Sequence, residues 1–203
     1  MDTLSRSSLL LYGPFCAQNN LQEKYAAKLE GVTGWAIGGP VRSLLARAKE
    51  LQIGDVTVRD LVIRRSAQKT GLTTSSAMAG RIGPNVLSQF DVTFDYARTR
   101  IIFEKNKNYG RRDSYDRAGI WMGRDKDGKH FTVVDVIAGG PGAAAGVKSA
   151  DPILAINGKS TANLVLRNVR ETIRREAVGE KLTLLLESGG KQRTAVVTLK
   201  ALV

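Results

Sequence analysis

The sequence offers few of the side chains that enzymes most often use for chemistry. It has one cysteine, Cys16, and one histidine, His130, among 203 residues. A single cysteine excludes an internal disulfide framework and a zinc site built from several thiolates. A single histidine argues against multi-histidine metal sites and most histidine-based triads. We therefore predict no metal and no cofactor, and we expect Cys16 to be a small buried side chain.

The other motifs that suggest reactivity lack a partner. Ser5, Ser7 and Ser8 lie close together, but His130 belongs to the other half of the chain and cannot act as their base. The glycine-rich stretch 31–39 lacks the Lys-Ser/Thr ending of a phosphate-binding loop. Neither a serine nucleophile nor a nucleotide site is predicted.

The chain is strongly basic, with 31 Lys and Arg against 19 Asp and Glu and a net charge of +12. Such a charge attracts nucleic acids or anionic membranes through its long-range field. The best basic candidate lies near the middle of the chain and comprises Arg98, Arg100, Lys105, Lys107, Arg111 and Arg112, with Tyr109 nearby. No nucleic-acid-binding fold signature accompanies it, so we expect a basic surface and keep binding to nucleic acid or an anionic surface as the least favoured alternative.

No segment predicts a membrane span. The run Leu9-Leu10-Leu11 is far shorter than the ~20 apolar residues that cross a bilayer. A basic n-region and a small-residue cleavage site are also missing, so no signal peptide is predicted. If Met1 is the true start, the chain is expected to stay in the cytosol; otherwise its compartment is left open.

Local patterns divide the chain into two halves joined by a polar, basic segment. Residues 1–105 are strand-rich, 106–115 read as a linker, and 116–203 form a compact α/β module. The first half is expected to hold a helix over 18–29, a strand over 56–63 and a hairpin over 91–103. In the second half we expect strands over 131–137, 153–156, 182–186 and 195–199, and a helix over 164–177.

The second half resembles a bacterial PDZ domain. The resemblance rests on an ordered series of pieces: Ala118-Gly119-Ile120, Val133 to Val136, Gly140 to Val147, Asp151 to Gly158, and the helix through Arg170 to Ala177. PDZ domains bind an extended peptide by adding it to an exposed sheet edge beside a helix. The resemblance therefore implies C-terminal or internal peptides as partners.

The resemblance also places the peptide-binding residues. The amides around Ala118, Gly119 and Ile120 would receive the peptide carboxylate, and glycine suits such a close approach to an anion. Leu166, Val169 and Ile173 would line the groove, with plain core packing as the alternative for each. The helix start holds no histidine, so we expect the groove to prefer apolar peptide side chains.

The first half resembles the retropepsin-like aspartic proteases of bacteria. Asp2-Thr3-Leu4-Ser5 is similar to their catalytic Asp-Thr-Gly-Ser/Ala motif, and the stretch 80–96 is similar to their C-terminal segment. The resemblance implies a mainly β fold with some helix: a partial acid-protease β-barrel, followed by the PDZ domain as a partial barrel or sandwich with two helices.

An aspartic-type endopeptidase is the activity that this resemblance implies. Two carboxylates that share a proton activate water and protonate the leaving group. Each chain would supply one Asp2, so the pair would require a homodimer, with Thr3 bracing the loop across the axis.

Two departures keep an inactive alternative open. Leu4 stands where the motif has glycine, and the strands that precede the motif in relatives are missing. The resemblance also implies an export signal and a periplasmic location for full-length relatives. We therefore weigh two functions: an aspartic endopeptidase that works through paired Asp2, and a catalytically inactive PDZ protein that binds peptides or acts as a scaffold.

Overall fold

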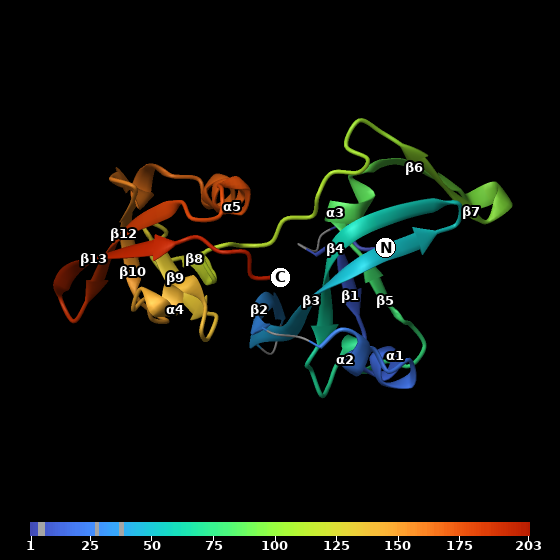
Figure 1. Ribbon diagram of the computed structural model, residues 1–203, viewed down its shortest axis with the longest axis horizontal. Coiled ribbons are helices and arrows are strands. Elements are labelled where there is room, and N and C mark those ends of the chain that lie inside the picture. Colours follow the sequence, from blue (N-terminus) through green and yellow to red (C-terminus); the bar gives the residue numbers. More distant parts are fainter. Residues whose placement is uncertain (4–6, 27–28, 37–38) are drawn as a thin grey trace. The chain divides into compact units, whose positions relative to one another are not determined.

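The computed structural model describes residues 1–3, 7–26, 29–36 and 39–203 and divides into two compact units (Figure 1). The first unit comprises Met1–Asp113 together with Val203, and the second comprises Ser114–Leu202. Both units are mainly β with short helices. Within the described residues, no helix has both the length and the apolar character needed to cross a membrane.

The first unit is built on an open five-stranded sheet with the order β2-β3-β4-β1-β5. Its centre is the long β3–β4 hairpin, which is in register from Ser43 opposite Ser66 to Ile53 opposite Val56. β1 runs parallel to β4 and antiparallel to β5. The strands are β1 (Leu9–Leu11), β2 (Leu29–Ala36), β3 (Gly39–Ile53), β4 (Val56–Ser66) and β5 (Gly80–Ile82).

A separate two-stranded hairpin and several short helices complete the first unit. The hairpin pairs β6 with β7 around a short 3-10 turn, which agrees with the hairpin expected over 91–103. These elements are α1 (Gly13–Gln18), α2 (Leu21–Lys24), η1 (Leu72–Thr74), α3 (Pro84–Leu87), β6 (Phe90–Asp95), η2 (Tyr96–Arg98) and β7 (Arg100–Lys105).

Two expectations for the first half need correction. The helix predicted over 18–29 is wrong: Asn20 adopts a left-handed backbone (φ 51°) that separates α1 from α2, and Leu29 already begins β2. The partial acid-protease barrel is not confirmed, because the described strands form an open sheet and a separate hairpin and do not close a barrel.

The second unit contains an antiparallel sheet with the order β13-β12-β10-β9-β8, and short β11 pairs with β10. The strands expected near 131–137, 153–156, 182–186 and 195–199 are all present, as is the helix expected over 164–177. The elements are β8 (Ile120–Arg124), β9 (Phe131–Val136), α4 (Pro141–Ala144), β10 (Pro152–Ile156), β11 (Lys159–Ser160), η3 (Thr161–Asn163), α5 (Leu166–Arg175), β12 (Lys181–Ser188) and β13 (Lys191–Thr198).

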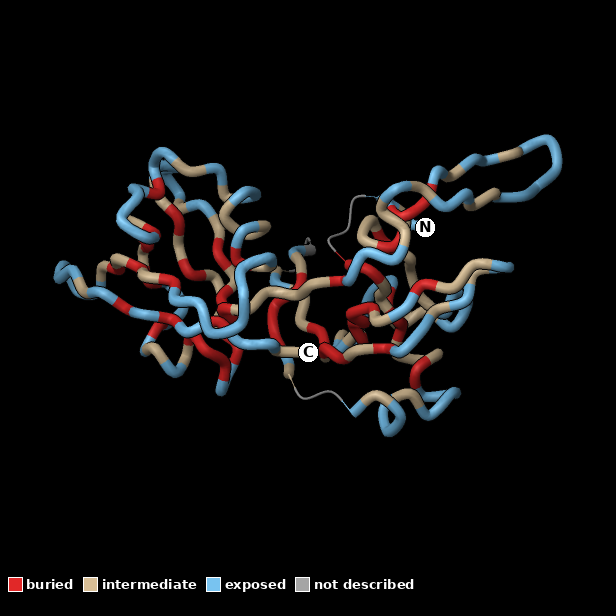
Figure 2. Tube along the Cα trace, turned by 45° about the horizontal axis from the view of Figure 1, so that its top comes forward, coloured by how far each residue is buried: buried red, intermediate tan, exposed pale blue. Residues whose placement is uncertain are grey.

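Each unit has its own hydrophobic core. In the first unit, Leu61 and Ile63 of β4 are fully buried and pack with Leu11 and Cys16. Burial raises the pKa of the Cys16 thiol, and nearby Arg65 lowers it by a smaller amount. In the second unit, buried side chains alternate with half-buried ones along β12 and with exposed ones in the second half of β13. Figure 2 shows the buried positions along the strands of both units.

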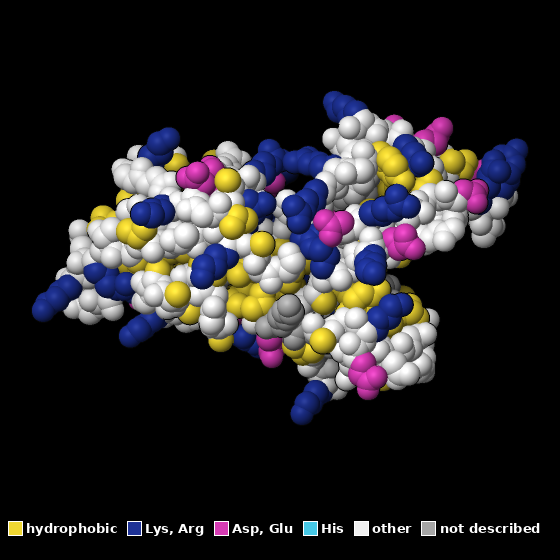
Figure 3. All heavy atoms as spheres, viewed as in Figure 1, with side chains coloured by type: hydrophobic (Ala, Val, Ile, Leu, Met, Phe, Trp, Pro, Cys, Tyr) yellow, Lys and Arg dark blue, Asp and Glu magenta, His cyan; other side chains and the backbone are white. Residues whose placement is uncertain are grey.

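Basic side chains are widely distributed on the surface. On the face drawn in Figure 3, Lys and Arg side chains are spread over both units and interspersed with apolar atoms. Of the residues in the predicted basic segment, Arg98 and Arg100 both pair with Asp95, and Arg112 pairs with Asp60. Part of the basic charge in this segment is therefore neutralised within the first unit.

Candidate functional site

The feature of the second unit best suited to binding is the edge of its sheet. β8 pairs with β9 on one side and is the terminal strand of the sheet among the described residues. The helix α5 contacts β8. An edge strand presents backbone donors and acceptors that an extended peptide can pair with.

The loop that leads into β8 has a backbone shape that concentrates amide groups. Gly119 has a φ of +68°, and a Cβ placed there would lie 3.4 Å from Cδ of Pro141. Two backbone hydrogen bonds hold the carbonyls of this loop. The Ile137 amide donates to the Gly119 carbonyl at 2.9 Å, and the Gly142 amide donates to the Ala118 carbonyl at 2.8 Å. A run of amides in this kind of turn forms a concavity that suits an anion.

A carboxylate of the same chain occupies this concavity. The Gly119 amide donates to Oδ1 of Asp116, with 2.6 Å between nitrogen and oxygen. Burial raises the pKa of Asp116, while hydrogen bonds from the amides of Gly119, Ile120 and Ala118 and the nearby charge of Arg174 act in the opposite direction. The amides expected to receive a peptide carboxylate thus already interact with an internal one.

The structure places the predicted groove residues in two different environments. Leu166 and Val169 of α5 are half-buried and pack against the core of the second unit, so part of each side chain stays accessible. Ile173 is only 1% exposed and lies in that core, which matches the core-packing alternative. The side chains of Ala118 and Ile120 are also buried, which leaves their backbone as the part that can contact a ligand.

Two arginines connect β8 to α5 and to the loop before it. The Arg170 guanidinium donates to the Met122 carbonyl, and its Cζ lies 5.4 Å from the centre of the Trp121 ring. Arg124 donates to the Leu164 carbonyl at 2.9 Å. Sequence reasoning missed Asp116 and Arg170 as site residues. The one available signal was the Asp-x-x-Gly spacing of Asp116 and Gly119, which is typical of a turn in which the aspartate accepts from a following amide.

The predicted catalytic residues of the first unit lie in a different setting from an acid-protease dyad. Oδ2 of Asp2 forms an ion pair with Nη1 of Arg81 at 2.9 Å, and the Asp2 amide donates to the Ile82 carbonyl. The second carboxylate of a dyad would come from another copy of the chain, so pairing of Asp2 stays a prediction. Thr3 is exposed, and Leu4 lies outside the described residues.

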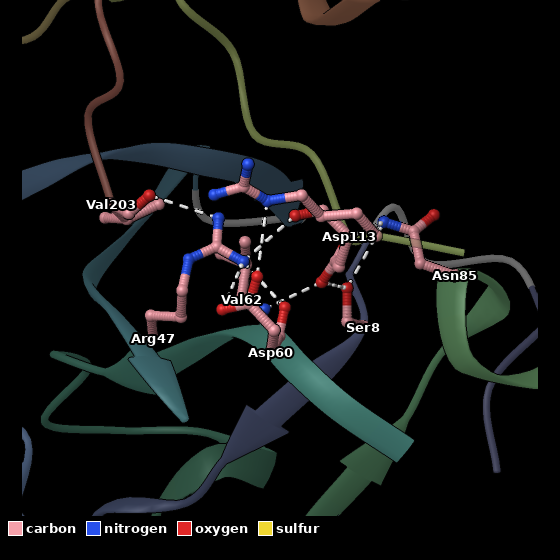
Figure 4. Close-up of polar contacts among 8 residues, drawn as sticks. Ser8, Arg47, Asp60, Val62, Asn85, Asp113 and Val203 are labelled. Atoms are coloured by element: carbon pink, nitrogen blue, oxygen red, sulfur yellow. Dashed lines mark hydrogen bonds and ion pairs between the residues drawn. The ribbon is translucent and has the colours of Figure 1, made fainter. Parts of the chain in front are cut away.

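The first unit also holds a buried carboxylate, that of Asp113, in a polar network (Figure 4). Asp113 is 7% exposed and accepts from the Ser8 hydroxyl, from the Val62 amide at 2.7 Å and from Nδ2 of Asn85 at 3.1 Å. Nη1 of Arg47 donates to the Asp113 carbonyl at 3.1 Å. Asp113 accepts in every one of these contacts, so its carboxylate and carbonyl hold together Ser8, β3, β4 and α3.

His130, the one histidine of the chain, lies in the second unit. Nδ1 of His130 lies 3.0 Å from Oγ1 of Thr161, within the second unit. Across the described ranges, no group of three or more His, Cys, Asp or Glu side chains is arranged to hold a metal ion.

Comparison with known proteins identifies one domain. Residues 132–188 match the family model of the PDZ domain, so the chain contains a PDZ domain. No curated protein matches the sequence.

Several solved proteases share structural similarity with the chain. The photosystem II D1 C-terminal processing protease is 24% identical, with 46% of this chain and 25% of that chain covered and a TM-score of 0.40. The HtrA-type protease AlgW with decapeptide is 14% identical, with 85% and 60% covered and a TM-score of 0.40. The serine endoprotease from Yersinia pestis is 15% identical, with 86% and 62% covered and a TM-score of 0.38.

These similarities correct the expected activity. The chain spans between a quarter and about three-fifths of the length of these proteins. They are serine-class proteases, so the prediction of an aspartic-type endopeptidase is wrong. With TM-scores below 0.5 and identities below 25%, the likeness carries no argument for a serine mechanism in this chain.

Proposed function

We propose that this chain is a peptide-binding protein whose PDZ domain takes up an extended peptide along β8, and that the first unit is a scaffold without a catalytic role. The observation that carries the proposal is that β8 is the terminal strand of the sheet among the described residues and lies beside α5, in a domain that matches the PDZ model. Backbone pairing with this edge would supply affinity, and side chains facing α5 would supply selectivity.

The accessible side chains of α5 favour apolar peptide residues with acidic neighbours. Leu166 and Val169 offer partly exposed apolar surface to a peptide side chain. Arg167 is exposed and Arg170 reaches β8, so the surroundings of the groove are positively charged. Complementary charge mainly raises the rate of association and helps to exclude wrong partners.

We place the PDZ domain at residues 116–203, the first domain at 1–105 and the connecting segment at 106–115. Part of that segment packs in the first unit: the Tyr109 hydroxyl donates to the Thr57 carbonyl at 2.6 Å, and Asp113 is buried.

Fluorescence polarisation with the full chain tests the proposal. The probe is a pool of labelled synthetic decapeptides with apolar residues at alternating positions near the C-terminal end. Val169→Lys puts a charge on the groove side of α5, and Val196→Lys puts the same charge on β13, where Val196 is 48% exposed at the opposite end of the sheet. Equal melting temperatures of both variants and the wild type are established first.

We expect the wild type to bind members of the pool, Val169→Lys to weaken that binding at least about tenfold, and Val196→Lys to leave it unchanged within about twofold. Equal losses in the two variants would place binding elsewhere. A wild-type chain that binds no member of the pool would refute the proposed function.

A further inference from the structure

We propose that Asp116 makes the groove take internal peptide segments in preference to free C-termini, because its carboxylate accepts from the Gly119 amide that a C-terminal carboxylate would need. The inference rests on the proposed function and adds a substrate class to it. The observation behind it is the hydrogen bond from the Gly119 amide to Asp116 at 2.6 Å.

Electrostatic repulsion keeps the loop before β8 from holding both Asp116 and a peptide carboxylate. The Gly119 amide lies between those of Ala118 and Ile120, and it already donates to the Asp116 carboxylate at 2.6 Å. A second carboxylate would lie within a few ångströms of the first, and two such charges cannot both stay ionised without a large penalty. A peptide with a free C-terminus must therefore displace Asp116 or bind without its carboxylate contact.

The loop has little freedom to turn its amides elsewhere. The carbonyls of Gly119 and Ala118 accept from Ile137 and Gly142 on the other side of the loop. The Gly119 backbone also lies close to Pro141. A peptide carboxylate would therefore have to replace Asp116 as the acceptor of the Gly119 amide.

An internal segment meets no such competition at the carboxylate position. It has neither a charge to place at the loop nor a chain end to accommodate, and it pairs with β8 only through its backbone. A second side chain of the protein also contacts this edge, because the Arg170 guanidinium donates to the Met122 carbonyl. The amides of a peptide could replace this donor without any repulsion between like charges.

The first arm of the test compares decapeptides that bind the wild type, each made with a free C-terminal carboxylate and as the carboxamide. Asp116→Ala removes the carboxylate that accepts from the Gly119 amide, and Asp116→Asn keeps an oxygen acceptor without the charge. Asp127→Asn, in the exposed turn between β8 and β9, removes one negative charge elsewhere in the same unit as a matched control.

The wild type and Asp127→Asn should bind the acid and the amide with Kd values within about threefold of each other. Asp116→Ala should gain a preference for the acid of at least about tenfold, the size expected for a charged hydrogen bond, and Asp116→Asn should fall between them. A wild-type preference for the acid above about tenfold, or no gain in Asp116→Ala, would overturn the inference.

The second arm does not depend on peptide binding. Sodium acetate is titrated into the ¹⁵N-labelled full chain, and the amide resonance of Gly119 is followed by NMR. We expect this resonance to shift with acetate in Asp116→Ala and to stay constant in the wild type. An equal response in both would show that Asp116 does not block the loop, even if no peptide binds and the proposed function has failed.

Discussion

Removing the Asp113 carboxylate should destabilise the first unit without affecting the second. Asp113 is 7% exposed and accepts from Ser8, Val62 and Asn85. In Asp113→Ala these donors lose their acceptor, and hydrogen bonds to a charged group contribute ~1.5–3 kcal/mol each. Because neighbouring contributions are not additive, we expect a loss of ~3–5 kcal/mol, a large part of the ~5–15 kcal/mol that holds a typical domain folded.

Hydrogen exchange measured by mass spectrometry under increasing urea resolves the two units in one experiment. Exchange in β1 and β4 should begin at lower urea in Asp113→Ala, while exchange in β12 and β13 should follow the wild type. Asp113→Asn keeps one acceptor and should lose less. Asp55→Ala, at an exposed turn residue of the same unit, serves as the control. If Asp113→Ala is no less stable than Asp55→Ala, the structural role assigned to the network is wrong.

Two further predictions concern charges of the second unit. Because burial raises the native pKa of Asp116 despite the opposing effect of Arg174, the native state holds its proton at pH values where the unfolded chain has lost it. The stability due to this carboxyl is therefore complete below the ordinary aspartate pKa and is lost as the pH rises through the raised pKa. Urea unfolding at a series of pH values should show a free energy of unfolding that falls over this range in the wild type and not in Asp116→Asn. The same pH dependence in both proteins would contradict the prediction. Arg193→Ala should lower the free energy of unfolding by ~2 kcal/mol, because it leaves the buried Asp151, which is 6% exposed, without the guanidinium that lies 2.6 Å away. Calorimetric unfolding measures this loss, and Lys126→Ala, which removes one positive charge from the surface, is the control. Equal melting temperatures of the two variants would refute the prediction.

Local patterns were sufficient for most of the second unit and for only part of the first. Short apolar runs bounded by turn residues predicted β9, β10, β12 and β13, and buried positions alternate with more accessible ones along much of β9, β12 and β13. β3 was not predicted: its Leu, Ala, Lys and Glu residues favour helix, and pairing with β4 overrides that preference. The interruption at Asn20 depends on one left-handed residue inside a helical pattern.

The contacts at the candidate sites were harder to infer from the sequence. The pairing of Asp2 with Arg81 joins residues 79 positions apart, and the position of Asp113 depends on β1, β4 and α3 together. Nothing in the composition of either segment specifies such contacts. The position of the PDZ loop could be predicted from Ala118-Gly119-Ile120, but its occupation by Asp116 depends on the backbone conformation at Gly119.

The placement of β1 has a consequence for the order in which the first unit folds. β3 and β4 are joined by a tight turn and can pair early, because the chain between them is short. β1 must bring Leu9 beside Ile63 on one side and Ile82 on the other, which closes two long loops with a strand of only 3 residues. We therefore expect the β3–β4 hairpin to form first and β1 to join late, with the assembly of β1, β4 and β5 limiting the folding rate.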